Sequence, residues 1–492
     1  MNNDYAIKIH PDDNVAVAIV TIQKDTDILG VAASQDIPVG HKIALEPIKT
    51  GENIIKYGYP IGSAQEDIAP GRHVHTHNIK TNLSGQLEYS YKPTLADAAP
   101  IINETFMGYK RDDGKVGIRN EIWIINTVGC VNLPAQRIAA MAEKKYAGRK
   151  IDGIFTFVHP YGCSQLGEDH AYTQRILANM VHHPNAGGVL VFGLGCENNT
   201  IASFKQVLGD VDENRVKFLV AQDFDDEIDA AMDAMDELVS YAEKFERTPQ
   251  SVSHLTIGLK CGGSDGFSGI TANPLVGVAS DMLVARGGIT ILTEVPEMFG
   301  AETILMDRCE TPALFDATVN LINDFKGYFM RYNQEVYENP SPGNKDGGIS
   351  TLEDKSLGCT QKGGTSNVTD VLEYGQIATK PGLNLLNGPG NDIVAITNLM
   401  AAGCHIVLFT TGRGTPVGAP VPTVKISSNS DLARRKSNWT DYNAGTLLEG
   451  KTMAEVGVDF WKYLIDVAEG KQTRNEENNY REIAIFKDGV TL

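Results

Sequence analysis

Leu255-Thr-Ile-Gly-Leu-Lys-Cys261-Gly-Gly-Ser-Asp265-Gly266 is the stretch that decides the fold class, because a short apolar run ends there in a glycine-rich loop that carries a thiol and a carboxylate. In an open α/β sheet, ligands bind outside the carboxyl ends of the strands. The pattern therefore predicts a parallel sheet with a site at that edge. Three more apolar runs end in the same manner, at Glu294-Val-Pro-Glu297, Gly388-Pro-Gly-Asn-Asp392 and Thr411-Gly-Arg413-Gly-Thr415.

The chain is 492 residues long, too long for one hydrophobic core, so we expect several domains. Residues 1–80 show short β-type runs and no helical period, which predicts a small all-β domain. Residues 81–107 are polar and aperiodic, as in a linker. Strand-like and helical runs alternate from there on, which predicts two α/β domains with parallel sheets at 108–250 and 251–492. A helix is expected over 225–247, with a boundary at Thr248-Pro249.

The composition excludes several classes of partner. A net charge of -19 argues against nucleic acid and against an anionic membrane surface. No apolar stretch approaches the length of about 18 residues that spans a membrane, and the amino terminus lacks a signal sequence. Seven cysteines, scattered singly, do not resemble a disulfide framework. We therefore expect a cytoplasmic protein with reduced thiols.

Four of the cysteines follow apolar runs closely, and they would converge if those runs were neighbouring strands of one sheet. Thiolates suit iron or an iron-sulfur cluster, although the spacing of the cysteines has no local metal-binding signature. Buried, inert cysteines are the alternative reading. The candidate metal ligands are Cys130, Cys163, Cys196 and Cys261.

The loops also carry acidic residues that could hold Mg²⁺, Mn²⁺ or Fe²⁺, or act as acid and base. Individually such carboxylates are often helix caps or solvated groups. The residues in question are Asp265, Glu294, Glu297, Asp354 and Asp392.

Two further features bear on binding. His73, His75 and His77 alternate in the β domain, a spacing that suits a lid over the site or a second metal, or else an exposed strand face. Arg413, between two glycines, suits a carboxylate or phosphate. The chain has no glycine-rich nucleotide-binding motif, so nucleotide binding is not supported.

The loops, taken as a set, resemble the altronate and galactarate dehydratase family over the whole chain. The strings that carry the resemblance include Cys261-Gly-Gly-Ser-Asp-Gly-Phe-Ser-Gly-Ile-Thr-Ala-Asn-Pro274, Glu294-Val-Pro-Glu-Met-Phe-Gly-Ala-Glu302, Asn339-Pro-Ser-Pro-Gly-Asn-Lys345, Leu352-Glu-Asp-Lys-Ser-Leu-Gly358 and Gly193-Leu-Gly-Cys-Glu-Asn198. The resemblance implies a SAF-like β-clip domain, a middle domain that forms a homodimer, and a Rossmann-like catalytic domain that carries the metal.

The same resemblance implies a small sugar acid as substrate, with D-altronate losing water to give 2-dehydro-3-deoxy-D-gluconate in galacturonate breakdown. Dehydration of galactarate and loss of sulfite from a sulfolactate are alternatives within the family. A sugar-acid binding protein without catalysis is an alternative of another class. The implied cofactor is Fe²⁺ under reducing conditions, or else Mn²⁺ or an iron-sulfur cluster.

The expected chemistry is removal of the C2 proton and loss of the C3 hydroxyl, for which a base and an acid are needed. Which residue is the base stays open. The catalytic candidates are Glu294, Glu297, Lys345, Asp354, Lys355 and His405, and the candidates for substrate binding are Ser264, Asp265, Asn273, Arg413 and Thr415.

Overall fold

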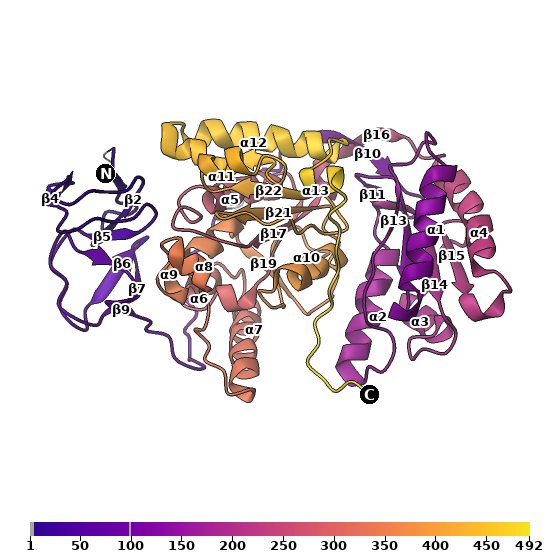
Figure 1. Cartoon of the computed structure of the whole chain (residues 1–492), viewed down its shortest axis with the longest axis horizontal. Coiled ribbons are helices and arrows are strands. Elements are labelled where there is room, and N and C mark those ends of the chain that lie inside the picture. The colour runs from indigo at the N-terminus through magenta and orange to yellow at the C-terminus, as the bar shows by residue number, and fades with distance from the viewer. Residues whose placement is uncertain (1–3, 98–99) are drawn as a thin grey trace.

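The computed structural model describes residues 4–97 and 100–492. The chain forms three parts in a row, with the carboxyl-terminal part between the other two (Figure 1). Two of the parts are α/β units with parallel sheets and the first is all-β, so the predicted fold class is confirmed.

The amino-terminal domain consists of short strands, and its described residues, 4–82, contain no helix. Isoleucine, valine and alanine side chains fill its two small cores, among them Ile43 and Ile54. A four-stranded antiparallel sheet has the order β1 (Ala6–Ile7), β2 (Val15–Ala18), β5 (Lys42–Ala44) and β8 (His73–Val74). A second sheet contains β6 (Asn53–Lys56), β7 (Tyr59–Ala64) and β9 (Ile79–Lys80), and β3 (Asp27–Ile28) pairs with β4 (Val31–Ala32).

The linker lies against the carboxyl-terminal domain. The described residues between β9 and β10 (Thr105–Lys110) form no helix or strand. The Tyr91 hydroxyl donates a hydrogen bond of 2.6 Å to the Cys309 carbonyl, and the Thr94 amide donates one of 2.7 Å to the Asp307 carbonyl. These contacts fix the path of the linker along the surface.

The second domain contains a parallel sheet of four strands, in the order β13 (Ile154–Thr156), β12 (Glu121–Asn126), β14 (Ala186–Gly193) and β15 (Val216–Val220). Its helices are α1 (Asn132–Lys145), α2 (Gly167–Val181), α3 (Ile201–Leu208) and α4 (Glu227–Ala242). The helix expected over 225–247 is shorter, because residues from Arg247 onward form β16 (Arg247–Ser251). This strand pairs with β10, which in turn pairs with β11 (Val116–Gly117). Thr248-Pro249, expected as a domain boundary, lies within this paired strand.

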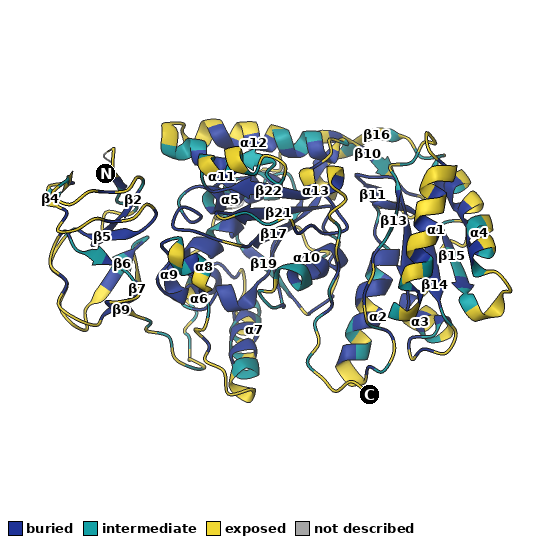
Figure 2. Cartoon of the chain, viewed as in Figure 1, coloured by how far each residue is buried: buried dark blue, intermediate teal, exposed yellow. Residues whose placement is uncertain are grey.

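The carboxyl-terminal domain is built on a seven-stranded sheet whose pairings are all parallel. The order is β19 (Val368–Leu372), β20 (Gly382–Leu386), β18 (Ile289–Leu292), β17 (Thr256–Cys261), β21 (Ile406–Thr411), β22 (Thr423–Ser427) and β23 (Tyr442–Asn443). Strands β17, β20, β21 and β22 are buried along their whole length (Figure 2), which explains their continuous apolar runs. The main helices are α5 (Ala272–Val284), α7 (Pro312–Arg331), α10 (Asp392–Ala401) and α12 (Met453–Ala468), and shorter ones are α6 (Glu302–Met306), α11 (Ser430–Arg435) and α13 (Arg474–Glu477).

Two polar segments expected as loops are helical. They are α8 (Pro342–Asp346) and α9 (Leu352–Cys359). The hydroxyls of Ser341 and Thr351 accept hydrogen bonds from backbone amides at the starts of these helices, which is the usual role of an N-cap. Every residue of α9 is buried, and polar residues occur on all sides of the helix. The sequence therefore shows no alternation of apolar and polar faces from which a helix could be predicted.

The amino-terminal domain docks on α9 and on the glycine-rich loops. Lys42 and Lys56 each donate to the Asp354 carboxylate, at 2.8 and 2.9 Å, and all three side chains are buried. A Cβ atom on Gly266 or Gly348 would lie 2.1 Å from the Gly40 carbonyl oxygen, so only glycine permits this approach of the two backbones. Some of the glycines thus serve domain contact.

In the described residues, no helix is long and apolar enough to cross a membrane.

The Asp354 ion pairs predict a large loss of stability on neutralisation. Burial alone would raise the pKa of Asp354, but Lys42 and Lys56 hold it well below its ordinary value, so the carboxylate is charged. We expect Asp354→Asn to destabilise the protein by about 3–5 kcal/mol, because two buried ammonium groups lose their counter-charge. Asp67→Asn, which removes an exposed partner of Lys49, is the matched control and should change little. Thermal unfolding of both variants measures this, and equal melting temperatures for Asp354→Asn and wild type would contradict it.

Candidate active site

Ionisable side chains, all buried except the half-buried Asp392, gather at the carboxyl ends of β17, β18 and β20. Lys260 and Cys261 end β17, and Glu294 and Glu297 follow β18. Asp392 begins α10 after β20. The remaining members come from α9 and from the 3-10 turn Thr360–Gly363 behind it. We call this set the charge cluster, and it consists of Lys260, Cys261, Glu294, Glu297, Lys355, Cys359, Lys362 and Asp392.

Glu294 lies at the centre of one half of the charge cluster. It is fully buried, and it adopts the left-handed backbone conformation with φ 68°, which is strained for a residue with a side chain. Its carboxylate accepts hydrogen bonds from Lys260 and, at 3.0 Å, from Lys362. Lys362 also donates to the Cys261 sulfur at 2.9 Å. Burial favours the neutral amine, but Cys261 and Glu294 hold the pKa of Lys362 well above its ordinary value.

Glu297 and Lys355 form the other half. The Lys355 ammonium lies 2.8 Å from one carboxylate oxygen of Glu297, and the sulfurs of Cys261 and Cys359 lie 3.1 and 3.2 Å from the other. Burial alone would raise the pKa of Glu297, yet Lys355, Lys260 and Lys362 hold it well below its ordinary value. Burial alone would lower the pKa of Lys355, and Glu297 raises it instead. The pair is therefore a carboxylate and an ammonium ion.

An open cleft of about 860 Å³ lies between the amino-terminal and carboxyl-terminal domains. Asp265 follows β17 and Arg413 follows β21, so the cleft stands where the chain order reverses between these neighbouring strands. Such switch points are the usual ligand sites of open α/β sheets. Asp265 also lines a small cavity of about 10 Å³ that reaches Lys355 and Cys359. The cleft thus leads towards the charge cluster.

The structure places the predicted substrate-binding residues in different settings. Ser264 lines the small cavity, and its buried hydroxyl has no hydrogen-bond partner among the described residues. Asp265 is held by Ser428, which donates to both of its carboxylate oxygens at 2.8 and 2.9 Å. Asn273 is engaged in the fold, because it accepts from Thr410 at 2.6 Å and donates to a carbonyl of α9. Of these three residues, Ser264 is the one that stays available to a ligand.

Arg413 is exposed and lines the cleft, whereas Thr415 beside it is half-buried and accepts a backbone hydrogen bond of 3.4 Å from Val417. Lys345 is half-buried on α8 and is not part of the charge cluster. Asp354 faces the amino-terminal domain, where two lysines occupy both of its oxygens. Its contacts are those of a domain-docking residue.

His405 lies in the core, away from the cleft. Its Nε2 donates to the Val116 carbonyl at 2.8 Å, and its Nδ1 accepts from the Thr256 amide at 3.0 Å. Both ring nitrogens are used to join β17 to the second domain. The placement supports a structural role.

The four cysteines expected to converge are divided between two sheets. Cys130, Cys163 and Cys196 follow β12, β13 and β14 of the second domain and are exposed. Cys261 ends β17 in the other sheet, so the structure does not bring it together with them. Among the described residues, the groups of three close potential ligands are His41, His73 and His75, and Cys261, Glu297 and Cys359. Whether the three exposed thiols bind iron stays a prediction.

The charge cluster does not fit a resident divalent cation. Cys261, Glu297 and Cys359 offer ligand atoms within 4.8 Å of one another, but ammonium groups already donate to Cys261 and Glu297. The hydrogen bond with Cys261 and burial raise the pKa of Cys359 well above its ordinary value, so this thiol keeps its proton. A cation there would meet the positive charges of Lys260, Lys355 and Lys362.

Sequence reasoning missed Lys260, Lys362, Cys359 and His41. Lys260 lies in the otherwise apolar strand β17, so its charge was not recognised as part of a site. Cys359 is the last residue of a segment expected to be a loop, and Lys362 lies three residues beyond it. A lysine at the end of a buried strand is itself a signal, because a buried ammonium ion needs a counter-charge.

The geometry is that of an acid–base site at the carboxyl edge of a parallel sheet in an α/β domain. The small β domain packs against the helix that carries Lys355. Family models match the chain in three segments. They are the "Altronate/galactarate dehydratase SAF domain" over residues 4–82, the "D-galactarate dehydratase/Altronate hydrolase, second domain" over 108–243, and "D-galactarate/Altronate dehydratase, C-terminal" over 252–491.

Three similar proteins cover nearly the whole chain. An altronate dehydratase of Escherichia coli (strain K12) is 54% identical over 492 residues, and one of Bacillus subtilis (strain 168) is 54% identical over 494 residues, with 99% of each chain covered. A galactarate dehydratase (L-threo-forming) of Escherichia coli (strain K12) is 32% identical over 504 residues, covering 98% of this chain and 96% of the relative. The chain belongs to the altronate/galactarate dehydratase family of enzymes.

The structural role of His405 predicts a pH dependence of stability. Burial lowers the pKa of His405 to about 4, below the ordinary 6.5, so the folded protein holds it neutral. Between pH 6.5 and 4 the unfolded chain binds a proton that the folded chain does not, and stability falls as the pH falls. We expect His405→Gln to lower stability at pH 7 and to flatten this acid-side slope by about 3 kcal/mol in total.

Urea unfolding at several pH values measures the effect, with the exposed His254→Gln as control. Turnover by the folded His405→Gln protein should remain within a few-fold of wild type. A loss of turnover with unchanged stability would show instead that His405 is catalytic.

Proposed function

We propose that this protein removes water from D-altronate to give 2-dehydro-3-deoxy-D-gluconate, a step of galacturonate breakdown. The observation that carries the substrate is the 54% identity, over 99% of the chain, to two altronate dehydratases. Identity to the galactarate dehydratase is 32%, which makes galactarate the second choice. The charge cluster and the cleft supply the chemistry.

Glu297 and Lys355 are suited to the two proton transfers. Glu297 is unprotonated and can accept the proton from C2, and Lys355 is protonated and can donate to the C3 hydroxyl. The electron pair of the C2–H bond forms the C2–C3 double bond, and the C3–O bond breaks with release of water. The resulting enol takes up a proton at C3 and loses the proton of its C2 hydroxyl, which gives the 2-keto acid. The assignment follows from protonation states and from the small cavity beside Lys355.

Positive charge is the second requirement, because removal of a proton next to a carboxylate creates a dianionic enediolate. Lys260, Lys355 and Lys362 place three ammonium groups in a dry site, where their charges act strongly. Arg413, on the wall of the cleft, is the candidate partner of the substrate carboxylate. The small cavity is too small for a six-carbon acid, so the proposal requires the amino-terminal domain or α8 to shift when substrate enters.

A cytoplasmic homodimer completes the proposal. The seven cysteines are unpaired in the described structure, and Cys261 and Cys359 form no disulfide although their sulfurs are 3.4 Å apart, which suits a reducing compartment. Leu133 and Met141 leave apolar area exposed on α1 of the second domain, which favours this domain as the dimer contact. Analytical ultracentrifugation of wild type and Leu133→Asp tests the contact.

The activity itself is tested with purified protein, a reductant and Fe²⁺. We expect formation of a 2-keto acid from D-altronate, at a higher kcat/KM than from galactarate. Release of sulfite from a sulfolactate in the same assay would favour the sulfo-lyase alternative. Tight binding of altronate without product would favour a binding protein, and either outcome would overturn the proposal.

Glu297→Gln and Lys355→Met test the two proton-transfer roles. Each variant should lower kcat by about 100-fold or more, since each removes one group that transfers a proton in the transition state. Lys380→Met is the matched control, because Lys380 pairs with Asp370 on the surface, and its kcat should be unchanged. Steady-state kinetics on folded protein measure the effects. A rise in KM with unchanged kcat for either variant would limit that residue to binding.

A further inference from the structure

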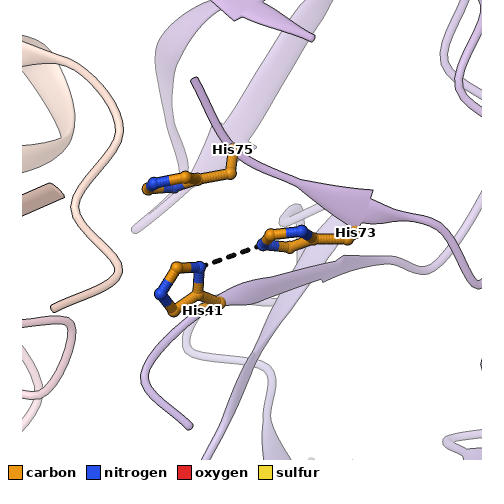
Figure 3. Close-up of side chains that lie close together, drawn as sticks. All are labelled: His41, His73 and His75. Carbon is orange, nitrogen blue, oxygen red and sulfur yellow. Dashed lines mark hydrogen bonds between the residues drawn. The ribbon is translucent and has the colours of Figure 1, made fainter. Parts of the chain in front are cut away.

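Three histidines meet on the amino-terminal domain where it faces the carboxyl-terminal domain. His41 directly precedes β5, His73 lies on β8, and these strands are paired, with Ile43 opposite His73. His75 comes directly after β8, and Figure 3 shows the three rings turned towards one another. Their ligand atoms lie within 4.8 Å of one another.

The tautomer of His41 leaves a lone pair inside this group. Its Nε2 lies 3.3 Å from the Asp346 carbonyl oxygen, which can only accept, so Nε2 carries the proton. In the neutral ring Nδ1 is then an acceptor, and it lies 3.0 Å from Nε2 of His73 (Figure 3). A metal-bound histidine commonly donates its other N–H to a backbone carbonyl in this way.

The distances between the rings suit a single ion. Two nitrogens at about 2.1 Å from one ion lie about 3.0 Å apart at a right angle and about 3.4 Å apart at the tetrahedral angle. The His41–His73 separation falls at the lower value. The ring centroid of His75 lies 4.5 Å from that of His41, and the buried Nδ1 of His75 has no hydrogen-bond partner among the described residues. This unsatisfied nitrogen needs an explanation.

We propose that His41, His73 and His75 bind one first-row divalent cation, such as Fe²⁺, Co²⁺ or Zn²⁺, at the interface of the amino-terminal and carboxyl-terminal domains. Neutral imidazole is a preferred ligand of these ions, and three protein ligands leave a coordination position open. The site differs from the charge cluster in ligand type and in domain.

The electrostatic setting separates the two groups. Among the described residues, no ammonium group donates a hydrogen bond to a ring nitrogen of His41, His73 or His75. Lys42 is the nearby cation, and the Asp354 carboxylate 2.8 Å away offsets its charge. The Asp346 carboxylate adds negative charge near His41. In the charge cluster, by contrast, lysine ammonium groups already donate to the possible ligand atoms of Cys261 and Glu297.

The position of the site gives such an ion a role. Gly40, next to His41, lines the cleft together with Asp346 and Arg413. An ion held by the three histidines would therefore stand near the cleft and connect both domains through the Asp346 carbonyl. Binding of the ion can be measured without turnover, so this inference stands independently of the proposed substrate.

Cobalt titration of the full-length, metal-free protein tests the site. We expect about one equivalent of Co²⁺ to give visible d–d bands without a thiolate-to-cobalt charge-transfer band, because the ligands are imidazoles. His41→Ala and His73→Ala should each weaken this binding at least tenfold. His77→Ala is the matched control, because His77 is exposed and close to His73 but outside the group of three. Circular dichroism checks the fold of each variant.

Two results would overturn the proposal. One is a thiolate charge-transfer band at the first equivalent that is lost in Cys261→Ala and kept in His73→Ala, which would place the ion in the charge cluster. The other is an equal affinity for Co²⁺ in wild type, His41→Ala and His73→Ala when all are folded.

Discussion

The site depends on one constraint: at one edge of the seven-stranded sheet, each lysine ammonium group of the charge cluster needs a carboxylate as its counter-charge. Three lysines and three carboxylates lie within the charge cluster, and a buried charge without a partner is costly. Lys260 illustrates the arrangement, since it occupies an otherwise apolar strand and contacts both Glu294 and Asp392. The left-handed backbone at Glu294 turns its carboxylate back towards β17. The ion pairs therefore fix the positions of these side chains relative to one another.

The amino-terminal domain is a part of this arrangement. Asp354 lies one residue before Lys355 on α9, so the helix that presents Lys355 to Glu297 is held on its other side by Lys42 and Lys56. Movement of the amino-terminal domain would shift α9 and the Lys355 ammonium group with it. Substrate entry and positioning of the acid are in this way linked through one helix.

Much of the fold could be predicted from the sequence, because buried parallel strands appear as apolar runs. The apolar run that precedes Glu294 is β18, and the α/β character of both larger domains follows from the alternation of runs. The buried helix α9 could not be predicted, since its polar residues occur on every side. At the site, Glu294, Glu297 and Lys355 were identified from their loops, but their partners were not. Which buried ammonium meets which carboxylate depends on tertiary contacts such as that between Lys362 and Cys261.

The roles of Glu297 and Lys355 are tested most directly by a crystal structure of Glu297→Gln with D-altronate bound. We predict the substrate carboxylate at Arg413, with C2 next to residue 297 and the C3 hydroxyl within hydrogen-bond distance of the Lys355 ammonium group. Altronate bound away from the charge cluster, for example at the exposed thiols of the second domain, would contradict it.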